Sequence, residues 1–337
     1  MPIKTSFSSI PLRRRALLSG AAAFTGAAAF WPQGVLADEA WPSRSVRIIV
    51  PFAPGGGADG SARVLAEVLA PRLGQGVIVE NKPGAGSAIG VNAAAQSKDG
   101  HTLLMGSNSM VINPSLTPGL GYDVARDFDA VGMVSSQPLV LVVPASSPLK
   151  TLADVIAEAK AQPGRLTAGN SGNGTLAHLA SEIFSGQTGT SLIPVPYKGE
   201  SALMPDLLGG RISLGFLNLP SVVAHIRAGR LRAIAVSSSK EVPELPGIPT
   251  FRALKQPSLE VSGWAALFAP KASIPAEGLA KLETLLAAAL ASDPVRTRFA
   301  TLGVTPVSKS RAETEKFIKD ETERYAAVIK ARNIKAG

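Results

Sequence analysis

The sequence predicts an α/β protein, and three observations support that prediction. Short apolar runs rich in β-branched residues alternate with stretches of helical periodicity, a pattern typical of parallel sheets covered by helices. Two of these runs end in glycine-rich turns that lead directly into a predicted helix. The chain of 337 residues is 45% apolar and 18% charged, so a sizeable core is expected and global disorder is not.

Eight apolar runs are predicted to form strands, and helical patterns lie between many of them. The runs are Val46–Val50, Val77–Val79, Thr102–Met105, Leu139–Val143, Leu166–Ala168, Leu192–Val195, Ile212–Phe216 and Leu231–Val236. The spacing Thr151-x-x-Asp154 indicates a helix start of the capping-box type. Two amphipathic helices are predicted at the C-terminus, one from near Pro275 and one after Ser310-x-x-Glu313.

Residues 1–37 have the features of an export signal. Three arginines at 13–15 precede an apolar run over residues 16–30, and the sequence VLA at 35–37 fits a small-x-small cleavage site. We therefore expect cleavage after Ala37 and a mature chain that begins at Asp38. The arginine pair followed by two leucines fits a twin-arginine signal, and an ordinary secretory signal fits equally well. The apolar run is too short and too rich in Ala and Gly to predict a membrane span.

The first glycine-rich turn, Gly55–Gly57, lies between the run at 46–50 and a helix predicted from Ala58. Such a turn presents free N–H groups and the positive end of the helix dipole, which predicts an anion site. The pattern Gly55-x-Gly57-x-x-Gly60, followed by Glu80, also fits a dinucleotide fingerprint. The prolines at 51 and 54 argue against a dinucleotide, because that turn leaves its strand directly. The other interpretation is a carboxylate pocket made of backbone amides.

The second glycine-rich turn, Gly169–Thr175, repeats the same order of strand, turn and helix. Two such turns facing each other across a cleft would bring two sets of backbone donors together, whereas either turn alone is more often a simple connection. A charge-assisted hydrogen bond contributes roughly 1.5–3 kcal/mol, so a few suffice for micromolar binding of a carboxylate, at about 8 kcal/mol. Ser171 is a poor nucleophile candidate because the last glycine of a G-x-S-x-G elbow is missing and His178 lies on the same segment.

Composition excludes several kinds of function. The chain has no cysteine and three histidines, which argues against thiolate chemistry, a metal site and a Ser-His-Asp hydrolase. Its 34 basic residues form no long run interleaved with aromatic residues, so no nucleic-acid partner is predicted. We expect neither an enzyme nor a bound cofactor.

Several segments, in order along the chain, resemble Bug-type solute-binding proteins, the TctC-like receptors of tripartite tricarboxylate transporters. They include PFAPGGGADGSAR from 51, NKPGAGSAIG from 81, GNSGNGTLAHLA from 169, VPYKGESALMPDLLGGRISLGF from 195 and WAALFAP from 264. The resemblance implies a periplasmic binding protein of the type II kind, with two domains that each have a central sheet flanked by helices, and a ligand cleft between them. Domain 1 would comprise residues 38–143 plus 259–337, and domain 2 residues 144–258.

The resemblance also implies the function. A monomeric receptor in the periplasm would bind a small organic anion, a carboxylate, and present it to the membrane subunits of a tripartite tricarboxylate-type permease. Glu200 departs from the family pattern, which usually has a small residue there, and it would disfavour a second ligand carboxylate or favour an amino group. The alternative function is an exported NAD(P)-dependent oxidoreductase that uses the turn at 55–60.

The residues expected to bind the ligand lie in the two turns and at the ends of the predicted strands. They are Phe52, Pro54, Gly55, Gly56, Gly57, Ser107, Asn108, Asn170, Gly172, Asn173, Gly174, Thr175, His178, Tyr197 and Asn218.

Overall fold

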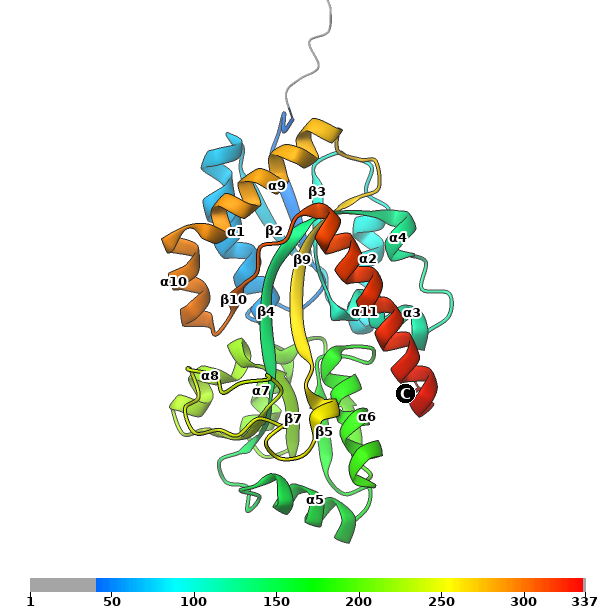
Figure 1. Ribbon diagram of the computed structural model, residues 1–337, viewed down its shortest axis with the longest axis vertical. Coiled ribbons are helices and arrows are strands. Elements are labelled where there is room, and N and C mark those ends of the chain that lie inside the picture. Colours follow the sequence, from blue (N-terminus) through cyan, green and yellow to red (C-terminus); the bar gives the residue numbers. More distant parts are fainter. Residues whose placement is uncertain (1–40, 336–337) are drawn as a thin grey trace, which may run out of the picture. The chain divides into compact units, whose positions relative to one another are not determined.

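The computed structural model describes residues 41–335 (Figure 1). The predicted export signal and its cleavage site after Ala37 lie outside these residues. No helix within residues 41–335 combines the length and the apolar character needed to cross a membrane.

One group of strands is built around β1 (Val46–Val50), which pairs in parallel with β2 (Val77–Asn81) and β3 (Thr102–Ser107). Strand β9 (Ser262–Pro270) runs antiparallel to β3 and to the first part of β4 (Phe128–Pro144). The short β10 (Thr305–Pro306) pairs antiparallel with β4. The buried side chains of β1 and β3 form the core of this group, as their β-branched and leucine-rich sequences predict.

A second group of strands uses the last part of β4, which pairs antiparallel with β7 (Leu214–Asn218) and β8 (Leu231–Val236). Strand β5 (Thr167–Asn170) pairs in parallel with β7 and β6 (Ile193–Pro196). In Figure 1, β4 runs from the upper group of strands to the lower one. Residues 128–138 of β4 pair with β9, and residues 139–144 pair with the second group. The two groups are therefore joined by one continuous strand.

Helices flank both groups of strands (Figure 1). They are α1 (Gly57–Leu73), α2 (Ala88–Ala95), α3 (Asn108–Leu116), α4 (Val124–Asp127), α5 (Leu152–Ala161), α6 (Leu176–Thr188), α7 (Glu200–Leu208), α8 (Leu219–Arg227), α9 (Ala276–Ala291), α10 (Asp293–Leu302) and α11 (Arg311–Arg332), with 3₁₀ turns η1 (Ala85–Ser87) and η2 (Pro257–Leu259). The predicted capping boxes at Thr151 and Ser310 are both confirmed, since each side chain and its N3 acid exchange hydrogen bonds with the backbone.

The α/β class is confirmed, but the expectation of parallel sheets is wrong for the centre of the molecule. The sheet is mixed, because β4 and β9 run antiparallel to their neighbours. The C-terminal region also holds a third helix, α10, that the apolar pattern did not predict. Its sequence DPVRTRFATL is mostly polar, and its boundaries are set by Pro294 in the first turn and by Gly303, which has a left-handed conformation.

Candidate functional site

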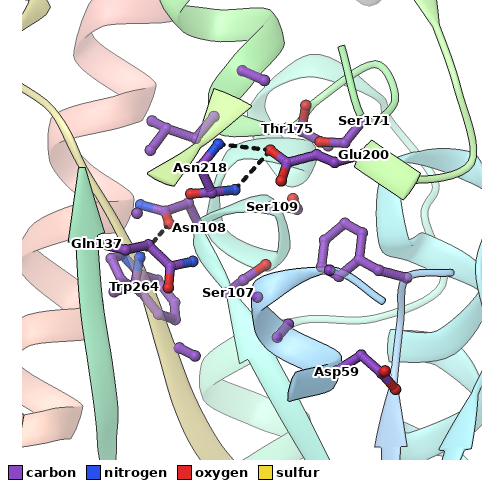
Figure 2. Close-up of a pocket in the computed structure, with 18 of the residues that line it drawn as sticks. Asp59, Ser107, Asn108, Ser109, Gln137, Ser171, Thr175, Glu200, Asn218 and Trp264 are labelled. Atoms are coloured by element: carbon purple, nitrogen blue, oxygen red, sulfur yellow. Dashed lines mark hydrogen bonds between the residues drawn. The ribbon is translucent and has the colours of Figure 1, made fainter. Parts of the chain in front are cut away.

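A cavity of about 60 Å³ is lined by residues from both groups of strands (Figure 2). Its lining comprises Phe52, Ala53, Gly56, Gly57, Ala58, Asp59, Ser107, Asn108, Ser109, Gln137, Ser171, Thr175, Leu176, Ala177, Glu200, Asn218, Gly263, Trp264 and Ala265. Nine of these nineteen residues are polar or charged, and the others are glycines and apolar or aromatic residues, so the cavity offers many groups that could form hydrogen bonds to a ligand.

Five helices of the described chain begin at this cavity. The lining contains the N-cap residues of α1, α3, α6 and α8, which are Gly56, Ser107, Thr175 and Asn218, and the first residue of α7, Glu200. The N–H groups of a first helical turn have no acceptor within the helix, and they carry the positive end of its dipole. Main-chain donors from several directions therefore converge on one space, which suits an anion.

The charged side chains of the lining are both acidic. Within residues 41–335, the lining holds no lysine, arginine or histidine, and it holds the carboxylates of Asp59 and Glu200. An anion bound here would therefore be held by backbone dipoles and neutral groups instead of by a cationic side chain.

The Asp59 carboxylate forms hydrogen bonds with residues near the first glycine turn. Its carboxylate accepts hydrogen bonds from Gly55 N–H at 3.0 Å, Asn81 Nδ2 at 2.9 Å and Arg63 Nε at 3.0 Å. Burial alone would raise the pKa of Asp59, but these hydrogen bonds outweigh burial and the pKa lies below its usual value. Figure 2 shows its carboxylate pointing away from the other labelled side chains. Asp59 thus holds the first glycine turn in shape.

Glu200 is buried, with 6% of its surface exposed, and its carboxylate lies over the start of α8. Its Oε1 accepts hydrogen bonds from the Asn218 N–H and from Asn218 Nδ2, both at 2.9 Å (Figure 2). The Ser221 hydroxyl donates to Oε2. Burial raises the pKa of Glu200, although the hydrogen bonds oppose that shift.

The side-chain amides of Asn108 and Gln137, which both line the cavity, differ in the hydrogen bonds that they form. Asn108 accepts from the Trp264 N–H at 2.9 Å and donates to the Ser262 carbonyl and the Tyr325 hydroxyl, both at 3.0 Å. It therefore holds β9 against the start of α3. Gln137 differs, because its buried Oε1 has no hydrogen-bond partner among the described residues. The Gln137 amide is available to a ligand.

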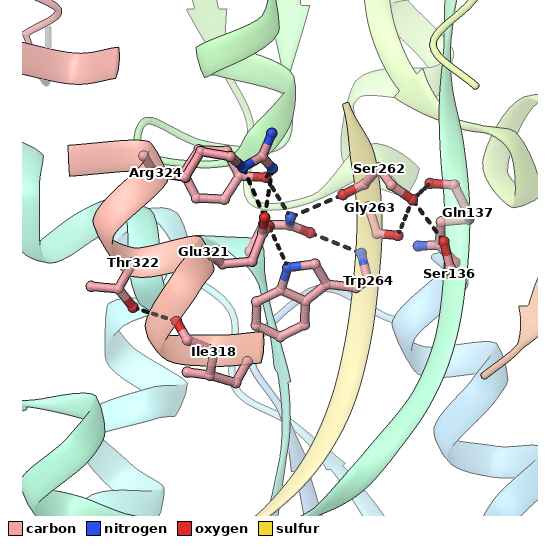
Figure 3. A network of polar contacts seen from close by, with 11 residues as sticks. Ser136, Gln137, Ser262, Gly263, Trp264, Ile318, Glu321, Thr322 and Arg324 are labelled. Carbon is pink, nitrogen blue, oxygen red and sulfur yellow. Dashed lines mark hydrogen bonds and ion pairs between the residues drawn. The ribbon is translucent and has the colours of Figure 1, made fainter. Parts of the chain in front are cut away.

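A second polar network supports Trp264 from behind (Figure 3). The Trp264 indole N–H donates to Glu321 of α11 at 3.0 Å, and Glu321 pairs with Arg324 at 2.7 Å. Since Trp264 is buried and lines the cavity, α11 fixes one wall of the site from a distant part of the sequence.

The structure brings about half of the predicted site residues to the cavity. Those that line it are Phe52, Gly56, Gly57, Ser107, Asn108, Thr175 and Asn218. Those outside its lining are Pro54, Gly55, Asn170, Gly172, Asn173, Gly174, His178 and Tyr197. Contact of either set with a ligand remains a prediction.

The N–H groups of the second turn are engaged within the turn itself. Gly172 N–H donates to Asn170 Oδ1 at 2.9 Å, Gly174 N–H to His178 Nδ1 at 3.3 Å, and Thr175 N–H to the Gly172 carbonyl at 3.2 Å. Tyr197 is similarly engaged, because its hydroxyl donates to Asp206 at 2.7 Å. From this segment, Ser171 of the turn and the helix start at Thr175 to Ala177 reach the cavity lining.

The second turn also packs against the first group of elements. A Cβ added to Gly174 would overlap the Asn113 side-chain oxygen, and one added to Gly86 would overlap the Asn173 carbonyl. Both glycines have positive φ, 76° and 58°. The Asn113 amide in turn donates to the Gly86 carbonyl at 2.6 Å. Glycine is therefore required here by close contact as well as by conformation.

Several lining residues were missed by sequence reasoning, among them Ser109, Gln137, Ala177 and Trp264. Ser109 and Ala177 lie in the first turns of α3 and α6, close to residues that were predicted to bind the ligand. Extending the predicted site by one helical turn would have included both. Gln137 and Trp264 come from β4 and β9, and their position depends on strand pairing that no local pattern indicates.

Two α/β groups of elements, joined by a shared strand and lining one cavity between them, define a two-domain solute-binding protein. The chain belongs to the receptor family of tripartite tricarboxylate transporters, whose family model, "Tripartite tricarboxylate transporter family receptor", matches residues 61–334. The predicted resemblance, fold class and receptor function are thereby confirmed, and the oxidoreductase alternative is not favoured.

Individual relatives agree with this family. Protein BugT of Bordetella pertussis is 40% identical over 300 residues, which cover 88% of this chain and 92% of BugT. The structure of the periplasmic binding protein BugD is 31% identical with a TM-score of 0.83, covering 88% of this chain and 99% of BugD.

Two similar structures carry named ligands. R. palustris Rpa4515 with adipate is 33% identical with a TM-score of 0.84, covering 88% of this chain and 99% of that one. MatC from Rhodopseudomonas palustris with bound malate is 28% identical with a TM-score of 0.81, covering 86% and 99%.

Proposed function

We propose that this receptor binds a small organic carboxylate in the cavity described above and presents it to the membrane subunits of a tripartite tricarboxylate-type permease. The observation that carries the proposal is the convergence of five helix starts on a cavity with no lysine, arginine or histidine in its lining, within residues 41–335. The bound adipate and malate of the two similar structures support a carboxylate as the ligand class.

The proposal includes where and how the receptor works. It acts as a monomer in the periplasm after cleavage behind Ala37, and it performs capture without catalysis. Domain 1 comprises residues 38–143 plus 259–337 and domain 2 residues 144–258. Closing of the two domains on the ligand stabilises the form that the membrane subunits recognise.

A charge introduced at Ser109 tests the anion site. Ser109 is buried in the first turn of α3 and lines the cavity, so its side chain faces the bound group. Ser109→Asp places a carboxylate there, and at an effective dielectric constant of about 20 two like charges 4 Å apart repel by about 4 kcal/mol. An acid in a first helical turn is compatible with the helix, so folding should be retained.

The matched control is Ser109→Asn, which has nearly the same size as Ser109→Asp and no charge. Calorimetric titration with a panel of small carboxylates, after native mass spectrometry of the mature protein, should show at least a ~100-fold loss of affinity for Ser109→Asp and a much smaller loss for Ser109→Asn. Equal losses for the two variants would argue against an anion in this cavity. A wild-type protein that binds no carboxylate of the panel, or that carries a dinucleotide, would refute the proposed function.

A further inference from the structure

Of the two acidic side chains that line the cavity, one is paired with a cationic side chain and the other is not. Asp59 and Glu200 are the acidic side chains of the lining, and Asp59 is paired with Arg63 at 3.0 Å. Within residues 41–335, Glu200 accepts hydrogen bonds only from neutral donors, those of Asn218 and Ser221. Its carboxyl group is therefore hydrogen-bonded, and no cationic side chain of these residues pairs with it.

Glu200 occupies the start of α8 in the way that an external anion would. The N–H of Asn218, the N-cap residue of α8, donates to the Glu200 carboxylate, and so does the hydroxyl of Ser221 in the first turn of α8. One of the five converging helix starts is thus already taken by the protein's own carboxylate. The start of α7 is Glu200 itself, and the starts of α1, α3 and α6 remain available to a ligand.

The lining of the cavity presents both hydrogen-bond donors and hydrogen-bond acceptors. Backbone N–H groups of α1, α3 and α6 are donors and favour a carboxylate. Glu200 is an acceptor, and the buried Oε1 of Gln137 is a second acceptor that lacks a partner within residues 41–335. A second carboxylate on the ligand would meet these acceptors with no donor of its own, whereas a hydroxyl or ammonium group would satisfy them.

The size of the cavity also limits the ligand. A volume of about 60 Å³ is several times the roughly 10–15 Å³ that a cavity needs to hold one water, which suits a small molecule. A short-chain acid of three or four carbons fits that size.

We propose that the ligand is a short monocarboxylate that carries a hydrogen-bond donor, an amino or hydroxyl group, and that Glu200 selects it by accepting that hydrogen bond and excluding a second carboxylate. This inference rests on the proposed function. It distinguishes this receptor from the similar structures with adipate and malate, whose ligands have two carboxylates.

The test is calorimetric titration of the mature protein with four small acids of similar size, used one at a time. The acids are propionate, L-lactate, L-alanine and malonate. Each acid is also tested with its chain lengthened by one and by two methylene groups. The wild-type protein should bind the hydroxy or amino member at least ten-fold more tightly than propionate and malonate. Comparison of lactate with alanine identifies which donor is used. This preference needs no variant, so the inference remains testable if a substitution at Glu200 fails to fold.

The variant Glu200→Gln has the same shape and loses the charge. It should bind malonate or its longer homologues at least ten-fold more tightly than the wild type does, and the amino or hydroxy acid more weakly. The control is Glu182→Gln, which removes a partly exposed carboxylate of α6 outside the lining and should leave the ratio of affinities unchanged.

The outcomes separate this inference from the proposed function. Tighter binding of the dicarboxylates than of the amino or hydroxy acids by the wild type would overturn the inference and leave the receptor function intact. An unchanged ratio of affinities in Glu200→Gln would also overturn it. Failure of every carboxylate to bind would refute the proposed function itself.

Discussion

The two glycine-rich turns look alike in the sequence and have different roles in the structure. Each follows a strand and opens a helix that begins at the cavity. In the first turn, Gly56 and Gly57 line the cavity, and Asp59 holds the turn by accepting the Gly55 N–H. In the second turn, the N–H groups of Gly172 and Gly174 are satisfied locally.

The comparison shows that a glycine of such a turn can have space for an added Cβ or can be required by a neighbouring side chain, and that the sequence does not separate the two cases. No described atom lies within 4 Å of a Cβ added to Gly56, whereas one added to Gly174 would overlap Asn113. The first turn is therefore open towards the cavity, and the second forms a contact between the two groups of elements. Three substitutions test this comparison.

The largest effect is expected from Gly174→Ala. Gly174 has φ 76° and would bring its new Cβ into the Asn113 side chain. The matched control is Gly164→Ala, since Gly164 has φ 71° and no described atom within 4 Å of an added Cβ. Both variants carry the strain of a left-handed alanine, about 1–2 kcal/mol, and Gly174→Ala adds about 1–3 kcal/mol of overpacking.

Urea unfolding of both variants measures the difference, and calorimetric titration shows whether Gly174→Ala also weakens binding by holding the two groups apart. The added substitution Asn113→Ala should recover part of the loss in Gly174→Ala and none in Gly164→Ala. Equal stabilities of Gly164→Ala and Gly174→Ala would mean that the second turn is not a close contact.

A smaller effect is expected from the histidine that holds the second turn. Burial lowers the pKa of the His178 imidazole, whose neutral Nδ1 accepts the Gly174 N–H. As the pH falls below about 6.5, the unfolded chain takes up a proton first. The free energy of unfolding therefore falls as the pH drops below that value, by at most about 1.4 kcal/mol per pH unit. The fall ends once the pH has passed the lowered pKa of His178 in the folded state.

His178→Asn keeps an acceptor near the position of Nδ1 and does not titrate. Its melting temperature should consequently fall less than that of the wild type between pH 7.5 and pH 5. His225, whose pKa burial lowers, titrates in both proteins and cancels in the comparison. Glu182, whose pKa burial raises, lies 4.0 Å from His178 Nε2, so both proteins are compared in a Glu182→Gln background. Parallel pH profiles would show that His178 does not hold the turn through its neutral form.

The smallest effect is expected from Gly56→Ala in the first turn. Gly56 has φ −86° and ψ 172°, which alanine adopts without strain, and the added Cβ meets no described atom within 4 Å. Alanine is a poorer N-cap than glycine, so the free energy of unfolding should fall by no more than about 1 kcal/mol. Since the N–H groups are unchanged, affinity for the tightest-binding short carboxylate should stay within about threefold. A large loss of affinity would show that the ligand needs the space beside Gly56.

Local patterns predicted the elements whose boundaries are set locally. Strands β1 and β8 were predicted to the residue, and both capping boxes were found, because each depends on neighbouring side chains. Strand β9 and the first part of β4 were missed. Residues 128–138 contain Gly132, buried Ser135 and Pro138, and they form a strand because β9 pairs with them from more than a hundred residues away.

The same distinction applies to the site. Residues beside a glycine turn or at a strand end, such as Gly57, Ser107 and Asn218, were predicted and do line the cavity. Trp264 could not be placed, because its position is fixed by Asn108, 156 residues earlier, and by Glu321 on the last helix. Gly172 and Gly174 were expected at the site and lie outside the cavity lining, with their N–H groups used inside the turn, so their contact with a ligand stays a prediction.

A cavity whose donors are main-chain N–H groups has a consequence for how such receptors diversify. No substitution other than proline removes a backbone N–H, so the proposed anion site at the starts of α1, α3 and α6 would persist while the side chains around it change. A new preference could then arise from a single side-chain replacement at the cavity, for example at position 200, without an intermediate that has lost the ability to hold a carboxylate. The fold keeps the general affinity for the ligand class constant and leaves selectivity free to evolve.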